Sequence, residues 1–334
     1  YFSSQQQRYY SQATRACAFM STVSKTLCAS PFSITLPGHI QLKQHQISTR
    51  EGLILSLLND DGSLYAQGEC SPLPYYSKES LADVSSAAKQ LNSIEIPSYI
   101  DAIDTGKFPQ YSSYPSLQWA IESAILCAQL RHLKGSLLNT QPLLQSVEDL
   151  VSDRFIVPTH GIVKVKCGKQ APSVENKKLI QALAQHPTLR LRCDVNNRLS
   201  YEDALRLFKS IEPSRIDYVE DPCKDPLDYE RFFSNTGIPY ALEAHALATI
   251  APKALKGLKA IIYKTTLMGS LAHYHEIKST FKHCDIIFSS CFESEIGLNA
   301  LATVATQLSK NTVHGLGTGR YVGLDTNNAY WCIQ

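Results

Sequence analysis

The sequence contains no apolar run close to the roughly 18 residues that a membrane-spanning helix requires, so we expect no insertion into a membrane. An excess of charge is also absent, since the formal net charge of the 334 residues is +2. A balance so close to zero gives no sign of a nucleic-acid or acidic-membrane partner. No positively charged leader precedes an apolar core, and we assign no function to the polar, Gln-rich opening YFSSQQQRYYSQ.

Cysteine pairs of the CxxC type are absent among the ten cysteines, which makes a thiolate zinc site improbable. Several cysteines, such as Cys167 and Cys193, lie in or beside apolar stretches. Packed, reduced thiols of this kind are typical of a reducing compartment, so we expect the protein in the cytoplasm.

A glycine-rich phosphate loop is missing as well, although short β-branched runs alternate with helical segments from about residue 120 onward. Strand starts recur about every 21 to 29 residues, the length of one strand plus one helix, which favours a barrel over a doubly wound sheet. We therefore predict an α/β fold, a (β/α)7β TIM-like barrel with an N-terminal α+β capping domain. The expected strands are 161–167, 189–196, 216–222, 238–244, 260–266, 284–292 and 311–317, and the expected helices are 174–186, 200–211, 226–237, 253–258, 272–281 and 297–308.

The sequence before residue 120 lacks the regular alternation of strand and helix. A strand-like run at 48–59, a turn at 59–63 and a helix-like run at 79–91 indicate a smaller α+β domain, and the Ser-, Tyr- and Pro-rich segment 100–116 is the expected connection. The predicted division is a capping domain at 1–120, a barrel at 121–318 and a C-terminal segment at 319–334 that returns toward the capping domain.

The stretch GIVKVKC places Lys164 and Lys166 on one face of a strand, because side chains alternate along extended backbone. Val163, Val165 and Cys167 share the opposite face. Taken alone, the lysines fit an edge strand whose charges discourage aggregation. The alternative is that the pair faces a site.

Polar side chains recur where successive expected strands end, and in a barrel those ends meet around one site. Each has an ordinary explanation by itself: a turn or helix cap for Asp194, a helix start for Glu220, a surface position for Glu243 or Lys264. All these explanations would have to hold together at matched positions, so we predict a shared site. Its expected members are Lys164, Lys166, Asp194, Asn196, Glu220, Asp221, Glu243, Lys264, Ser289, Ser290 and Glu293.

Three of these carboxylates, Asp194, Glu220 and Glu243, would form an all-oxygen site for a hard divalent cation, Mg²⁺ or in its place Mn²⁺. The lysine pair on one flank and Lys264 on the other would face each other across the metal. Ammonium groups crowded near a divalent cation lose protons more easily, so a lysine can act as a base near neutral pH. A substrate carboxylate held by the metal would then stabilise the enediolate formed when the α-proton is removed.

These residues resemble the enolase superfamily, whose members use a Lys or His base with Mg²⁺ to stabilise such an intermediate. Within it, the chain is most similar to the o-succinylbenzoate synthase family of menaquinone biosynthesis. The resemblance runs from about residue 30 to 325. It rests on the order and spacing of REGLIL, GECSPLPYYSKESL, PSLQWAIESAI, the KVK strand, CDVNNRLS, VEDP, IIYKTTLMGS, SSCFESEIGLNALA and HGLGTGRY.

The resemblance implies a lyase that dehydrates a small carboxylate, 2-succinyl-6-hydroxy-2,4-cyclohexadiene-1-carboxylate, to 2-succinylbenzoate. Lys166 would remove the α-proton and assist loss of water, Lys164 would tune it and touch the substrate carboxylate, and Lys264 would stabilise the anion from across the ring. The loop before Arg50 and the turn at 71–75 would close over the succinyl arm. Substrate contacts are implied for Arg50, Ser289, Ser290, Gly315 and Gly317, with Asn196 and Asp221 supporting the metal ligands.

One position departs from the family pattern: the third ligand is usually Asp followed by Glu, whereas Glu243 is followed by Ala244 and His245. A racemase or epimerase of the same superfamily stays open, because facing lysines also suit proton exchange between two bases. Dipeptide epimerases typically carry an Asp-x-Asp pair near the last strand, which HGLGTGRY lacks, whereas N-acylamino acid racemisation is harder to exclude. A degenerate barrel that only binds is the third alternative, and the sequence leaves open a monomer or a homo-oligomer.

Overall fold

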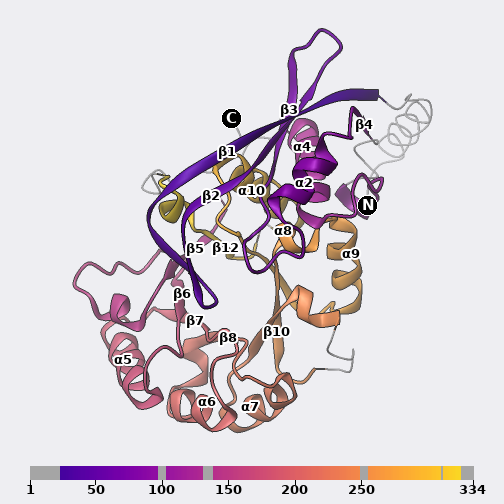
Figure 1. Cartoon of the computed structure of the whole chain (residues 1–334). Helices are drawn as coiled ribbons and strands as arrows, with labels where there is room; N and C mark the ends of the chain where they lie inside the picture. Colours follow the sequence, from indigo (N-terminus) through magenta and orange to yellow (C-terminus); the bar gives the residue numbers. More distant parts are fainter. Residues whose placement is uncertain (1–22, 97–102, 131–137, 249–254, 310, 325–334) are drawn as a thin grey trace, which may run out of the picture.

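The structure is a computed structural model that describes residues 23–96, 103–130, 138–248, 255–309 and 311–324. Its strands form one antiparallel sheet of four strands and one parallel sheet of eight (Figure 1). The four-stranded sheet belongs to an N-terminal domain that lies over one end of the eight-stranded sheet.

The N-terminal sheet has the strand order β3-β2-β1-β4. Its strands are β1 Val23–Leu42, β2 His45–Leu58, β3 Leu64–Cys70 and β4 Ser93–Ile96. β1 and β2 form one long hairpin, whose turn contains Lys43 in a left-handed conformation. The expected strand at 48–59 and turn at 59–63 agree with β2 and the connection to β3. The sequence does not predict β1, which is largely exposed and carries two prolines, both unfavourable to a strand assignment.

The expected helix at 79–91 is α2, Leu81–Ala88. Its start carries reciprocal capping: Ser80 Oγ accepts a hydrogen bond from the main-chain N–H of Asp83, and the Asp83 carboxylate accepts one from the N–H of Ser80. The helix buries Val84 in the core of the N-terminal domain, which places it against the sheet.

Helix α4, Pro115–Leu130, joins the two domains. Leu117 and Ile121 pack into the core of the N-terminal domain, whereas Trp119 and Leu126 pack into the core around the barrel. A helix with apolar contacts on several faces lacks a polar side, and α4 is accordingly buried along most of its length.

The barrel strands are parallel and follow the order β11-β10-β9-β8-β7-β6-β5-β12, and a bridge between Ser289 and Gly315 joins the two ends of this series. The predicted TIM-like fold is thereby confirmed. The strands are β5 Thr140–Leu144, β6 Ile162–Lys166, β7 Arg190–Asp194, β8 Ile216–Glu220, β9 Tyr240–Glu243, β10 Leu258–Tyr263, β11 Asp285–Phe288 and β12 His314–Gly317. The helices that follow β6 to β11 are α5 Pro172–Gln185, α6 Tyr201–Phe208, α7 Tyr229–Thr236, α8 Thr265–Met268, α9 Leu271–Thr280 and α10 Glu295–Ser309.

The position of β6 decides between the two explanations of the lysine pair. β6 lies between β5 and β7, so the edge-strand explanation is wrong. Val163, Val165 and Cys167 pack into the core between strands and helices, and the lysines point to the barrel interior, as the alternation predicts.

Other expected elements meet the structure less closely. β5 is absent from the sequence prediction, because TQPLL is short and contains a proline. The helix expected at 253–258 is wrong where it is described, since β10 begins at Leu258; residues 253 and 254 lie outside the described residues. In the C-terminal segment, a 3₁₀ turn at Gly319–Val322 contacts β1, and residues 325–334 lie outside the description, as does the opening at 1–22.

None of the helices in the described ranges combines the length and the apolarity needed to cross a membrane. The eight cysteines within those ranges are free thiols, and six of them are buried. Burial of reduced thiols agrees with the sequence prediction that they serve as packing groups.

Candidate active site

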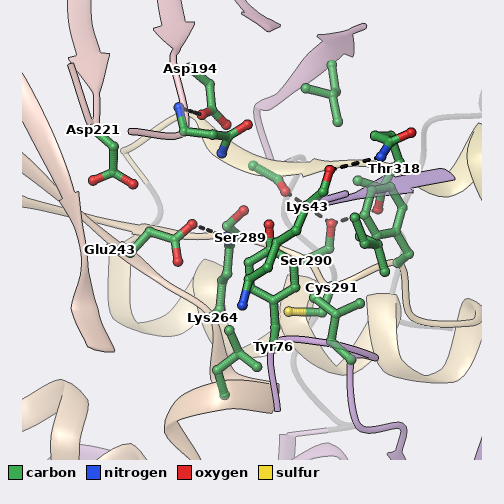
Figure 2. Close-up of a pocket in the computed structure, with 18 of the residues that line it drawn as sticks. Lys43, Tyr76, Asp194, Asp221, Glu243, Lys264, Ser289, Ser290, Cys291 and Thr318 are labelled. Atoms are coloured by element: carbon green, nitrogen blue, oxygen red, sulfur yellow. Dashed lines mark hydrogen bonds and ion pairs between the residues drawn. The ribbon is translucent and has the colours of Figure 1, made fainter. Parts of the chain in front are cut away.

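A cavity of about 530 Å³ opens where the barrel strands end, and the N-terminal domain covers it (Figure 2). The cover consists of the hairpin tip at residues 41–44 and the segment after β3, which contributes Tyr76. Most predicted site residues therefore come together around one space, supplied by β6 through β12. Those that line it are Lys164, Lys166, Asp194, Asn196, Asp221, Glu243, Lys264, Ser289, Ser290, Gly315 and Gly317.

The two lysines of β6 contact the carboxylates of the next two strands. Lys166, Asp194 and Glu220 each end a strand and are register partners across β6, β7 and β8. Lys164 Nζ lies 2.5 Å from Glu220 Oε2 and 2.8 Å from Asp194 Oδ2. Lys166 Nζ lies 2.6 Å from the same Asp194 oxygen and donates to Asn196 Oδ1 at 2.8 Å. One carboxylate oxygen thus holds both ammonium groups side by side.

Lys264 stands on the opposite side of the barrel. It follows β10, which is separated from β6 by β7, β8 and β9 in one direction and by β5, β12 and β11 in the other. Its ammonium group donates to Oε1 of Glu243, the last residue of β9. Figure 2 shows both residues. The two lysine flanks expected from the sequence therefore face each other across the cavity.

The carboxylates set the protonation of the lysines. Burial alone would lower the pKa of Lys164, but Asp194 and Glu220 outweigh it and raise that pKa above its ordinary value. Burial is likewise outweighed by Glu243 at Lys264, whose pKa is well above the ordinary value. The protein groups by themselves thus hold these two lysines protonated.

Within the cluster at the ends of β6 to β10, negative charge nevertheless exceeds positive charge. Four buried carboxylates, Asp194, Glu220, Asp221 and Glu243, face three ammonium groups. Burial, and then the charge of Asp194, raise the pKa of Glu220. Burial and then Glu243 raise the pKa of Asp221. Repulsion of this kind in a buried cluster is relieved by a cation.

The carboxylates offer free oxygens for such a cation. In the described ranges, no three acidic, His or Cys side chains lie close enough together to form a ligand cluster. The carboxylates contact Lys164, Lys166 and Lys264 instead. Yet Glu220 Oε1 and Glu243 Oε2 are buried and accept no hydrogen bond. Glu243 Oε2 lies 3.0 Å from His245 Nδ1, but the two groups are not aligned for a hydrogen bond. Buried polar atoms normally have partners, and hard carboxylate oxygens are the donors that Mg²⁺ prefers. The residues present fit a divalent cation.

The predicted serines and glycines form the wall of the cavity at the ends of β11 and β12, where Figure 2 shows Ser290, Cys291 and Thr318. Ser290 Oγ lies 2.6 Å from Thr318 Oγ1. Gly317 is required by packing, because a side chain there would lie 2.2 Å from the main-chain oxygen of Gln141 in β5. Substrate contacts of this wall stay a prediction.

Three expected residues, Glu220, Arg50 and Glu293, do not line the cavity. Glu220 contacts Lys164, which does line it. Arg50 is buried between the domains, and its guanidinium donates to the main-chain carbonyls of Ser71, Pro72 and Cys291, with distances of 2.8 Å to Pro72 and 3.4 Å to Cys291. It ties the cap to the loop after β11, so direct contact with a substrate is not expected. Glu293 likewise stays off the cavity, accepting hydrogen bonds from Thr266 and from a main-chain N–H.

Backbone strain concentrates around the cavity. Six non-glycine residues of the described ranges have a left-handed φ, and five of these line the cavity. Such conformations cost free energy and tend to persist where the surrounding structure requires them for function. The five are Lys43, Asn196, Asn197, Asp221 and Phe292.

Sequence reasoning missed several residues of the cavity wall. Lys43 and Tyr76 come from the N-terminal domain, and no local pattern connects them with the barrel. Lys169 and Arg198 follow β6 and β7 by a few residues. Their place in strand-to-helix loops is the one signal that could have marked them, because these loops surround the site of a barrel.

Comparison with known families and proteins agrees with this geometry. Residues 27–128 match the family described as MenC, N-terminal domain, and residues 145–314 match the family described as Enolase C-terminal domain-like. The chain is 30% identical over 299 residues to the o-succinylbenzoate synthase of Enterobacter sp. (strain 638), covering 86% of this chain and 88% of the relative. It is also 30% identical over 303 residues to that of Pasteurella multocida (strain Pm70).

Solved structures of similar fold include o-succinylbenzoate synthase from Thermosynechococcus elongatus BP-1, complexed with Mg in its active site. Its TM-score is 0.70 at 20% identity, over 89% of this chain and 94% of that chain. A substrate-liganded L-Ala-D/L-Glu epimerase from Bacillus subtilis has a TM-score of 0.70 at 17% identity, over 92% of both chains. Similarity at this level of identity concerns the fold.

Proposed function

Because the chain belongs to the o-succinylbenzoate synthase family of the enolase superfamily, we propose that it dehydrates 2-succinyl-6-hydroxy-2,4-cyclohexadiene-1-carboxylate to 2-succinylbenzoate. The observation that carries the proposal is the arrangement of Lys166 and Lys264 on opposite sides of a cavity, with three strand-end carboxylates between them. Each partner required for removal of a proton next to a carboxylate is then present in one space. The similar synthases support this choice of substrate.

Asp194, Glu220 and Glu243 would hold Mg²⁺, each from the end of its strand. Bound there, the cation would withdraw charge from the substrate carboxylate and so favour loss of the neighbouring proton. The bound cation would also neutralise part of the carboxylate charge that otherwise raises the pKa of Lys164 and Lys264. Mn²⁺ is a candidate substitute, because it takes the same oxygen ligands.

Lys166 is the proposed base. Its Nζ lines the cavity at the end of β6, where Asp194 and Asn196 fix its position. Neutral Lys166 takes the α-proton, the electron pair of the C–H bond forms a ring double bond, and the bond between the ring and the hydroxyl oxygen breaks. The hydroxyl leaves as water with a proton from the Lys166 ammonium, which returns the base to its neutral form.

Lys164 and Lys264 hold charge in place during this exchange. Lys164 keeps a positive charge beside the base and beside the position of the substrate carboxylate. Lys264 presents its ammonium from the opposite wall, so negative charge that spreads into the ring faces a cation. A cavity of about 530 Å³ lies in the range of small-molecule sites.

The test is direct. Incubation with the cyclohexadiene substrate and Mg²⁺ should produce the absorbance of the aromatic product, and EDTA should abolish it. The opposed lysines also favour a second candidate, racemisation of N-acylamino acids, because two facing bases can exchange a proton across one carbon. Exchange of the α-proton in D₂O, followed by NMR, distinguishes the two: exchange without dehydration activity would overturn the proposal, and Mg²⁺ binding without either activity would indicate a binding protein.

The cytoplasm is the proposed compartment, since the cysteines in the described ranges are free thiols and most are buried.

A further inference from the structure

The cavity is lined by two further cations close to the lysine pair in the sequence or the sheet, Lys169 from the loop after β6 and Arg198 from the loop after β7. The guanidinium of Arg198 is half-buried and makes neither a hydrogen bond nor an ion pair with any residue of the described ranges. A partly buried guanidinium with free donors is a binding group for a carboxylate, which it can hold with two parallel hydrogen bonds.

The loop that carries Arg198 is built rigidly. Asn196 and Asn197 both adopt left-handed backbone conformations, with φ of 52° and 54°. The main-chain N–H of Asn196 donates to Asp194 Oδ1 at 3.1 Å, and Tyr229 donates its hydroxyl to Asn197 Oδ1 at 2.5 Å. Two strained residues held in this way direct the next residue toward the cavity, and strain of this kind is typical of a functional loop.

The acidic residue nearest to Lys169 in the sequence, Glu175, already has its hydrogen-bond partners. Glu175 is buried at the start of α5, and its carboxylate accepts hydrogen bonds from the main-chain N–H groups of residues 168, 169 and 170. Burial and then the charges of Arg198 and Lys166 lower the pKa of Lys169, and Asp149 and Glu175 raise it by less. Lys169 and Arg198 therefore lie close enough for their positive charges to act on one another.

The cover contributes two further lysines to the cavity wall, Lys43 and Lys78. Lys43 at the hairpin tip donates to the main-chain oxygen of Tyr75 at 2.6 Å and lies 4.6 Å from the ring centre of Tyr76, whereas Lys78 is exposed. Lys169 keeps one hydrogen bond, to the main-chain oxygen of Gln145 at 2.6 Å, and has two further donors. Arg198 is thus the half-buried cation of the wall with free donors, and its charge acts on Lys169.

We propose that Arg198 and Lys169 bind the distal carboxylate of the succinyl arm, while the strand-end lysines and carboxylates act on the carboxylate of the ring. This inference rests on the proposed function and specifies it: the enzyme selects a dicarboxylate. Selection comes from the unpaired guanidinium, because a ligand without the distal carboxylate would leave it unsatisfied, whereas a dicarboxylate neutralises it.

Binding of two non-reacting ligands in the presence of Mg²⁺ tests the inference. 2-Succinylbenzoate carries the distal carboxylate, and 2-butyrylbenzoate ends the same arm in a methyl group. By calorimetry, the unaltered protein should bind the first at least tenfold more tightly. Arg198→Gln should lose tenfold or more for 2-succinylbenzoate and less than twofold for 2-butyrylbenzoate, Lys169→Met should show a smaller loss of the same selectivity, and Arg198→Lys should retain part of the affinity.

Arg206→Gln is the matched control, because Arg206 lies exposed on α6 and pairs with Asp203. It should leave both affinities unchanged. Equal weakening of both ligands by Arg198→Gln, or no preference of the unaltered protein for 2-succinylbenzoate, would overturn the inference alone. Failure of the unaltered protein to bind either ligand, together with absence of turnover, would overturn it along with the proposed function.

Discussion

Lys166 Nζ lies 2.6 Å from Asp194 Oδ2, and the two residues are register partners at the ends of adjacent parallel strands. The contact places the proposed base against a proposed metal ligand, with Lys164 Nζ 2.8 Å from the same oxygen. One carboxylate therefore links the acid-base group with the site of the cation, and a change at either residue should affect both.

Replacement of Lys166 by alanine should reduce kcat by about 10³-fold or more, because the proton acceptor is lost. Lys166→Arg should be nearly as inactive, since a guanidinium stays protonated at any working pH. Steady-state turnover of the cyclohexadiene substrate measures both. Unfolding in urea should be little changed, and Lys209→Ala, on the surface at the end of α6, is the control. Activity of Lys166→Arg within tenfold of the unaltered enzyme would assign the base to another residue.

Replacement of Glu243 tests the position at which the sequence departs from its family. Glu243→Ala should weaken Mg²⁺ binding by about 100-fold or more, at or beyond the upper end of the roughly 10- to 100-fold that is typical for loss of an outer partner. Glu243→Asp shortens the side chain by about 1.5 Å and should lower the affinity unless a water fills the gap. Titration calorimetry with Mg²⁺ compares them with Glu276→Ala, an exposed control on α9. If Glu243→Ala left the Mg²⁺ affinity unchanged, Glu243 would not be a ligand and the site would have only two protein ligands.

Replacement of Arg50 separates a tie between domains from a substrate contact. Arg50→Gln should lower the free energy of unfolding by roughly 2 to 4 kcal/mol, because the buried carbonyls of Ser71, Pro72 and Cys291 lose their donor. Arg50→Lys should recover part of the loss. Urea denaturation measures this, with Arg154→Gln at an exposed position as the control. A raised KM with unchanged stability would instead point to substrate binding.

Glu122 should make stability depend on pH. It is buried in α4 between Tyr111 and Tyr263, and burial raises its pKa from 4.5 to about 7, although Gln118 and the N–H of Leu271 donate to it. The folded state then binds the proton more tightly, so this stabilisation is complete below pH 4.5 and is lost as pH rises through about 7. The loss is on the order of 3 kcal/mol.

Urea denaturation between pH 5 and 8 checks this dependence. Relative to Glu122→Gln, the unaltered protein should lose stability as pH rises, because glutamine cannot ionise. Glu202→Gln, at an exposed position on α6, should behave like the unaltered protein. A constant difference between the unaltered protein and Glu122→Gln over this range would contradict the prediction.

Much of the barrel could be predicted because its signals are local. Alternation along β6 puts Lys164 and Lys166 on one face whatever surrounds the strand, and the recurrence of strand and helix brings the ends of successive strands to one edge. The ligand candidates Asp194, Glu220 and Glu243 follow from this rule, since each is the last residue of its strand.

Contacts between distant segments had no such signal. Arg50 looked like a substrate group in its motif, but the approach of the cap to the loop after β11 surrounds it with carbonyl groups. The guanidinium of Arg198 makes no ion pair with a described residue although Asp194, Glu202 and Asp203 lie within five residues of it, because Asp194 contacts Lys166 and Asp203 pairs with Arg206. The cover over the cavity depends on the docking of the β1–β2 hairpin. Backbone periodicity assigns a side chain to a face of its own element; which groups it meets there, and whether its charge is compensated, is decided only when the elements pack in three dimensions.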